Sequence, residues 1–178
     1  GVGTAAIQFA SQVPGTTIIT TAGSESKLDT CRSLGADLAI NYKHEEFDEA
    51  IEKEIGDSTV DVVLDFVGAP YWLQNMQVLA MDGRLVHLGL LGGKTVEKMD
   101  LSTILRKRLS VRGSTLRNRS DDYKARLIKE FTERFYGLFD EGILRPVIDS
   151  VYEWEEAEEA HQRMRHNLNT GKIILAGM

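Results

Sequence analysis

The stretch Gly1-Val2-Gly3-Thr4-Ala5-Ala6-Ile7-Gln8 opens the chain and decides how the rest of the sequence is read. In a fingerprint of the form G-x-G-x-x-G, a glycine turn leads into a helix whose backbone N–H groups face a pyrophosphate. Gly3 fits the last glycine, which lets the helix pack close to the sheet. The two earlier glycines and the strand before them are not in this sequence, so an ordinary helix start explains these residues equally well.

The composition is that of one soluble globular domain. The chain has 178 residues, 42% hydrophobic and 27% charged, and its net charge of −6 argues against nucleic acid as the main partner. It shows no signal peptide and no apolar run near the ~20 residues of a membrane span. The lone Cys31 excludes an intrachain disulfide and a Cys-rich zinc cluster, so we expect a cytoplasmic protein. Because the chain starts inside a motif, we expect a native N-terminus and any targeting signal to be missing.

Helical and extended patterns alternate with short connections, which is typical of a parallel α/β sheet. Of the predicted strands, Val60 to Val67 is expected to be fully buried, and Asp82-Gly83 to turn the chain into the next one. Ser24 is predicted to cap the second helix, which stops at Gly35. The predicted strands are residues 16–22, 37–42, 60–67, 84–88 and 110–114, and the other helices are residues 4–12, 46–55, 70–80 and 101–106.

The order of predicted elements changes after the strand at residues 110–114. Residues 121–139 have helical spacing of apolar positions, residues 147–154 read as extended, residues 155–165 as a helix and residues 172–175 as a strand. We place a boundary near Ile143, which gives a dinucleotide-binding domain over residues 1–142 and a C-terminal tail over residues 143–178. The tail is too small to stand alone, so we expect it to pack on a part that the chain lacks.

Several motifs in this order resemble one known family. They are Gly1 to Gln8, Leu34 to Asp37 with Asn41-Tyr42, Val63 to Gly68, Asp82-Gly83-Arg84, Leu88-Gly89, Glu159-Ala160-His161 and Gly171-Lys172. The chain resembles the cofactor-binding domain and tail of the medium-chain dehydrogenase/reductase superfamily, and within it the zinc-free, NADPH-dependent quinone oxidoreductases of the zeta-crystallin-like branch. This implies a doubly wound Rossmann-type sheet of order 3-2-1-4-5-6, with the first strand and the N-terminal catalytic domain missing.

The resemblance also implies an activity. A hydride would pass from NADPH to a quinone or a similar small molecule, and this half would hold the cofactor while the missing half shapes the acceptor pocket. We therefore name no catalytic residue and expect the fragment alone to be inactive and a poor autonomous folder. Two alternatives stay open: an enoyl or α,β-unsaturated carbonyl reductase of the same superfamily, and a non-catalytic NADPH-binding structural protein of the crystallin type.

Cofactor contacts are expected at the carboxyl ends of the strands, where ligands of open α/β sheets bind. By resemblance Asn167 is a further candidate, although an ordinary turn residue is the better explanation there. The predicted cofactor-binding residues are Gly1, Val2, Gly3, Thr4, Gly23, Ser24, Lys27, Tyr42, Phe66, Val67, His87, Leu88, Gly89, Leu90, Gly113, Ser114 and Thr115.

The second strand indicates which nicotinamide cofactor is preferred. An NAD-binding sheet places an acid at the end of this strand, about 20 residues past the glycine motif, whereas residues 20–24 contain none. Ser24 and Lys27 can bind a 2′-phosphate, and Tyr42 can add a hydroxyl or stack on the adenine. Glu25 lies between these groups but can point to solvent. A capping serine and a solvated lysine are the ordinary alternative, and we favour NADP(H).

The remaining polar residues suggest structural roles. His87, His161 and His166 could serve as acids or bases, but packed or half-exposed structural histidines are the more common case. Asp65 ends a strand, where a carboxylate more often accepts hydrogen bonds from nearby backbone N–H groups than transfers protons. No metal site is expected. The outer strand, Ser110 to Ser114, has an unpaired edge, and the resemblance implies a homodimer built there around Val111.

Overall fold

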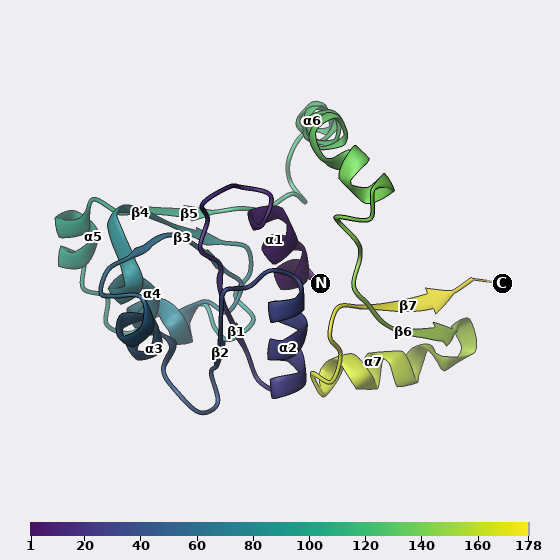
Figure 1. The fold of residues 1–178 in the computed structure, drawn as a ribbon, viewed down its shortest axis with the longest axis horizontal. Helices are drawn as coiled ribbons and strands as arrows, with labels where there is room; N and C mark the ends of the chain where they lie inside the picture. The colour runs from purple at the N-terminus through teal and green to yellow at the C-terminus, as the bar shows by residue number, and fades with distance from the viewer. Residues whose placement is uncertain (178) are drawn as a thin grey trace. The chain divides into compact units, whose positions relative to one another are not determined.

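The computed structural model describes residues 1–177 and has the α/β architecture with parallel strands that the sequence predicts (Figure 1). Its contacts divide the chain into two compact units. Unit 1 comprises Gly1–Tyr42 and the chain from Glu130 onward, and unit 2 comprises Lys43–Lys129. The boundary near Ile143 that we expect from the sequence stays a prediction.

Unit 1 contains two pairs of parallel strands and the helices next to them (Figure 1). β1 and β2 pair in parallel, with Ile19 opposite Leu38, and β6 pairs in parallel with β7. The elements of this unit are α1 (Val2–Ala10), β1 (Ile19–Ala22), α2 (Glu25–Ser33), β2 (Leu38–Asn41), the second half of α6 (Asp121–Asp140), β6 (Ile148–Glu153), the 3-10 turn η2 (Trp154–Glu156), α7 (Ala157–Arg165) and β7 (Lys172–Ala176).

Apolar residues at helical spacing explain why α2 packs against β1 and β2. Leu28 and Cys31 lie one turn apart on the same face and are 2% and 8% exposed. Cys31 joins Ile7, Ile18 and Ala36 in the core cluster of this part. The helix stops as predicted at Gly35, whose φ of +108° is a conformation that favours glycine.

Unit 2 is built on the three-stranded parallel sheet β3-β4-β5 (Figure 1). Its core brings Trp72 and Met76 of one helix against Leu85 of the central strand, with Leu79 and Leu109. The elements are α3 (Phe47–Glu54), β3 (Val60–Asp65), the 3-10 turn η1 (Ala69–Tyr71), α4 (Trp72–Val78), β4 (Leu79–His87), α5 (Ser102–Lys107), β5 (Ser110–Gly113) and the first half of α6.

The junction of α4 and β4 differs from the prediction. Leu79 and Ala80, predicted to be helical, begin β4, because the Lys107 ammonium group closes the end of α4. Lys107 Nζ donates to the carbonyls of Met76, Gln77 and Leu79 at 3.1, 2.7 and 2.8 Å. Asp82, with φ of +61°, does not start a new strand but lies within β4, where the pairing with β3 shifts register.

The burial of β3 also differs from the prediction. Val62 and Leu64 are 42% and 47% exposed, whereas the sequence predicts a fully buried strand. β3 has β4 as its one strand neighbour in the described chain, and the core cluster covers the face that carries Val63. The opposite face, which carries Val62 and Leu64, is therefore left open. β1-β2 matches strands 2 and 3 of the expected order 3-2-1-4-5-6, and β3-β4-β5 matches strands 4, 5 and 6, while no strand among residues 1–177 joins the two sheets.

Candidate functional site

The first helix begins at the glycine turn, as the sequence predicts. Gly1 is the N-cap of α1, and its carbonyl accepts hydrogen bonds from the backbone N–H of Ala5 at 3.2 Å and the hydroxyl of Thr4 at 3.1 Å. No side chain caps the helix. The first N–H groups of α1, from Val2 and Gly3 onward, therefore have no intrahelical acceptor, which suits an anion.

The carboxyl ends of β1 and β2 bring together the residues predicted to choose the cofactor. Tyr42 follows β2 and donates its backbone N–H to Ala22, the last residue of β1, at 3.3 Å. Gly23 leads to Ser24, the N-cap of α2, which has an extended backbone. The Ser24 hydroxyl makes no capping hydrogen bond, so the predicted side-chain cap is wrong.

Lys27 lies one turn into α2 and is held by the C-terminal part of unit 1. Its Nζ donates to the backbone carbonyl of Asn167 at 2.6 Å and to the Asn167 side-chain oxygen at 2.9 Å. Asn167 has φ of +53°, in the left-handed region that asparagine tolerates better than most residues. Sequence reasoning did not connect these two residues, which are far apart in the chain and share no motif.

No carboxylate competes for this position. Residues 20–24 contain no acid, and Glu25 points along the helix to Arg32, with its Oε1 2.7 Å from Arg32 Nη1. The same guanidinium contacts Asp29 at 2.7 Å. The carboxylates of Glu25 and Asp29 are thus paired with Arg32 on α2 itself.

The second group of predicted contacts lies in unit 2 and is organised by Asp65. This carboxylate is 4% exposed and accepts hydrogen bonds from the backbone N–H groups of Val67 at 2.6 Å and Gly68 at 3.0 Å. Asn75 Nδ2 donates to its other oxygen at 3.1 Å. The expectation that Asp65 binds nearby backbone N–H groups is confirmed. The turn after β3, with Phe66 and Val67, is therefore fixed by a buried charge.

Backbone hydrogen bonds join the loops that follow β3 and β4. The N–H of Leu88 donates to the backbone carbonyl of Asp65 at 2.6 Å. In the same way the N–H of Leu91 donates to the carbonyl of Phe66 at 3.0 Å, and that of Gly92 to the carbonyl of Val67 at 2.8 Å. This pairing brings predicted residues of both loops together, with Gly89 and Leu90 in between. Sequence reasoning missed residues 91–93, because their glycines resemble those of any turn.

Gly68 and Gly93 make the closest approach of the two loops. The N–H of Ala69 donates to the carbonyl of Gly93 at 3.0 Å. A Cβ on Gly68 would lie 2.5 Å from that same carbonyl oxygen, and Gly68 has φ of +91°. Glycine is therefore required at position 68, where the two loops lie in close contact.

His87 lies at the end of β4, and its ring contacts Asp65 and Trp72 of unit 2. Nδ1 lies 3.2 Å from Asp65 Oδ2, and the ring stacks on Trp72 with 6.3 Å between centroids. The backbone carbonyl of His87 accepts a hydrogen bond from the N–H of Ser114 at 2.9 Å. This bond places the exposed residues Gly113 to Thr115 beside the end of β4.

The other candidate groups do not form a reactive centre. Burial raises the pKa of the Cys31 thiol, which keeps it protonated and unreactive. His166 Nδ1 lies 2.8 Å from the carbonyl of Gln162 at the end of α7, and His161 lies exposed on the same helix.

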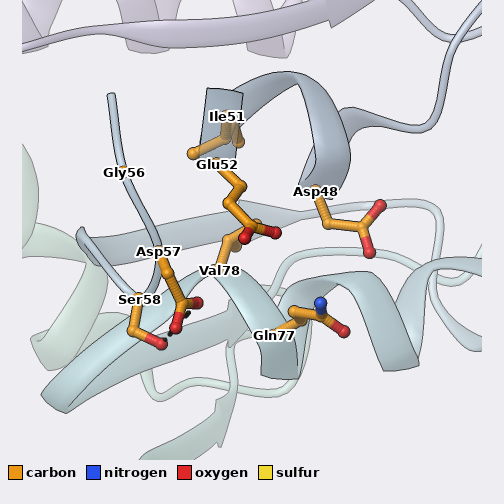
Figure 2. Close-up of a pocket in the computed structure, with 8 residues that line it drawn as sticks. All are labelled: Asp48, Ile51, Glu52, Gly56, Asp57, Ser58, Gln77 and Val78. Atoms are coloured by element: carbon orange, nitrogen blue, oxygen red, sulfur yellow. Dashed lines mark hydrogen bonds between the residues drawn. The ribbon is translucent and has the colours of Figure 1, made fainter. Parts of the chain in front are cut away.

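Metal ligands are not gathered anywhere among residues 1–177, because no three His, Cys, Asp or Glu side chains there lie together as a metal would need. Figure 2 shows a shallow acidic depression in unit 2, bordered by Asp48 and Glu52 of α3, by Asp57, and by Val78 of α4. Its one dashed hydrogen bond joins the Ser58 hydroxyl to Asp57 Oδ1 at 2.9 Å.

The helices within residues 1–177 are all too short or too polar to cross a bilayer.

Known proteins are similar to this chain in sequence. The family model described as zinc-binding dehydrogenase matches residues 1–133. Quinone oxidoreductase-like protein 2 of Bos taurus is 29% identical over 98% of this chain and 49% of its own length, so the chain spans about half of that relative.

Solved structures are similar over nearly the whole chain. The crystal structure of Escherichia coli quinone oxidoreductase complexed with NADPH has a TM-score of 0.85 and 26% identity, over 99% of this chain and 54% of its own. A structure named NAD-dependent alcohol dehydrogenase has a TM-score of 0.79 and 30% identity, over 100% of this chain and 48% of its own.

Proposed function

The chain belongs to the zinc-binding dehydrogenase family, and we propose that it is the cofactor-binding half of an NADPH-dependent oxidoreductase that reduces quinones. The similar proteins of known structure include one complexed with NADPH and one named as NAD-dependent, so the comparisons leave the cofactor open. The ends of β1 and β2 favour NADP(H).

One observation carries this choice. At the end of β1 the chain has no carboxylate, Glu25 is paired with Arg32, and Lys27 lies one turn into the next helix. A carboxylate there would repel a 2′-phosphate, whereas an ammonium group attracts it. Tyr42, 37% exposed and adjacent in the pairing of the two strands, adds a hydroxyl or a ring that can stack on the adenine.

The residues of both units take distinct roles in this proposal. When bound, the nicotinamide supplies a hydride for the acceptor. The glycine turn, Gly1 to Thr4, binds the pyrophosphate through the N–H groups of α1. The hydrogen-bonded loops at residues 66–68 and 88–90 would line the path toward the nicotinamide, and residues 113–115 would lie near the ring. In this proposal the chain binds and orients the cofactor, and no residue in it is assigned to the transfer of protons.

Three further features belong to the same proposal. The enzyme would work without zinc, because the motifs of this chain resemble those of the zinc-free branch of the superfamily. It would be a homodimer paired through β5, the last strand of its sheet, and it would be cytoplasmic.

An assay of the full-length protein tests the proposed function. NADPH oxidation with an ortho-quinone should be rapid, and NADH should be a poorer donor. Turnover with an α,β-unsaturated carbonyl but not with the quinone would support the enoyl reductase instead. Binding of NADPH without turnover on either acceptor would support a structural protein that keeps the cofactor site.

A further inference from the structure

The motif Gly171-Lys172 has no role in the function proposed so far, although the structure positions it tightly. The N–H of Lys172 donates to the carbonyl of Val147 at 2.8 Å at the start of the β6-β7 pair. Gly171 has φ of +102°, and a Cβ there would lie 2.3 Å from the Val147 carbonyl oxygen. The backbone at Lys172 is therefore fixed by a contact that only glycine permits.

From this position the Lys172 side chain lies along the glycine turn. A Cβ added to Gly1 would lie 3.0 Å from Lys172 Nζ, 3.1 Å from its Cε and 3.4 Å from its Cδ. Lys172, Gly1 and Thr4 border one open cavity of about 270 Å³, so there is room for a phosphate group beside them.

The charge of Lys172 has no partner within residues 1–177, since its ammonium group forms no ion pair or hydrogen bond with any side chain or carbonyl described there. Its ammonium group also lies beside the start of α1. The start of a helix carries partial positive charge, so a cation stabilises the end of a helix and is repelled at its start. An anion bound between Lys172 and the N–H groups of α1 would remove this repulsion.

We propose that Lys172 is a cofactor-binding residue whose ammonium group pairs with the pyrophosphate of the dinucleotide at the glycine turn. The inference rests on the proposed function, because it requires a dinucleotide to bind there. It assigns the two lysines of unit 1 to different phosphates. Lys27 binds the 2′-phosphate, and Lys172 binds the pyrophosphate that NADPH and NADH share.

Titration of the full-length protein with three ligands separates these roles. Lys172→Gln removes the charge, Lys172→Arg keeps it, and Lys53→Gln removes an exposed lysine charge in unit 2 as a control. Lys172→Gln should weaken NADPH and NADH by the same factor, roughly 10- to 100-fold for a charge-assisted contact. Adenosine 2′-phosphate, which lacks the pyrophosphate, should bind unchanged. Lys172→Arg should recover most of the affinity, and Lys53→Gln should have no effect.

Chemical protection gives a second measurement that needs no variant. In the wild-type protein NADH should protect Lys172, but not Lys53, from acetylation, and adenosine 2′-phosphate should protect neither. Three results would overturn the assignment. Lys172→Gln could bind both dinucleotides with unchanged affinity, or it could lose affinity for NADPH alone. In the wild-type protein, NADH could fail to slow the acetylation of Lys172. A wild-type protein that binds neither dinucleotide refutes the proposed function itself.

Discussion

Lys27 of α2 donates two hydrogen bonds to Asn167, one to its carbonyl at 2.6 Å and one to its side-chain oxygen at 2.9 Å. The ammonium group is thus oriented from a residue that follows α7. A lysine side chain loses up to ~2 kcal/mol of rotamer entropy when it is fixed. Because Asn167 already restrains Lys27, less of this cost falls on the binding of a 2′-phosphate.

Lys27→Ala should lower the affinity for NADPH and leave the affinity for NADH unchanged. The expected loss is about 1–3 kcal/mol, the range of a hydrogen bond to a charged group whose partner is removed. Titration of both cofactors into the full-length protein measures it, with Lys27→Arg as the charge-conserving control. Equal weakening of both cofactors, or none, would show that other residues read the 2′-phosphate.

Asp65→Ala should destabilise the protein by about 1–3 kcal/mol, because the N–H groups of Val67 and Gly68 and the amide of Asn75 lose their acceptor in a buried place. Cofactor affinity should fall as well, since the loop at residues 66–68 loses its anchor. Denaturant unfolding and nucleotide titration of the full-length protein measure the two effects. As a control, Leu109→Ala should reduce stability through a core cavity and leave cofactor affinity intact. An Asp65→Ala variant with normal stability would contradict this account.

The tail should lose stability in acid. The Arg163 guanidinium, 2.6 Å from Asp149, and the Thr170 N–H hold the pKa of the Asp149 carboxyl well below its ordinary value, against the effect of burial. A carboxyl with a lowered folded pKa stabilises the fold above its unfolded pKa, and this contribution is lost as the pH falls below about 4.

The variant Asp149→Asn isolates this contribution. It should be less stable than wild type at pH 7, and the difference should shrink as the pH falls toward 2. Thermal unfolding of the full-length protein at several pH values measures this difference in stability. If the difference in stability between wild type and Asp149→Asn stays constant from pH 7 to pH 2, protonation of Asp149 does not contribute to the pH dependence of stability.

Val111→Pro should convert the proposed dimer to a monomer. The N–H of Ser114 points to β4, and alternate N–H groups of a strand point to opposite sides, so that of Val111 points to the open edge. Proline removes this donor while β4 keeps its bonds to β5. Sedimentation of the full-length protein reports the mass. A dimer that persists would place the interface elsewhere.

Residues 1–178 expressed alone should unfold without a sharp transition. The described chain has two-stranded sheets and a three-stranded one, and none of its strands joins β1-β2 to β3-β4-β5. Two-stranded sheets are marginally stable in water. Calorimetry provides the measurement, and a cooperative peak with equal calorimetric and van't Hoff enthalpies would show that residues 1–178 fold by themselves.

Local patterns predicted most elements because they depend on residues near each other. The periodicity of residues 121–139 gave α6, and the β-branched run at Ile19 gave β1. The end of α4 was missed because it depends on Lys107, about 30 residues away. Lys27 and Asn167 likewise meet through tertiary structure alone. Asp65 was predictable in role, since a carboxylate at a strand end usually binds the next turn, but its bond to Asn75 was not.

The contact between Gly68 and Gly93 has a consequence for any redesign of these loops. An insertion or deletion between Leu88 and Gly93 would displace the partners of three backbone hydrogen bonds at once. Changes in loop length therefore belong in residues 94–100, which follow the contact, are mostly exposed and have no regular secondary structure. Within the contact, substitutions at Leu90 and Leu91, both more than half exposed, can alter the surface while the backbone keeps its course.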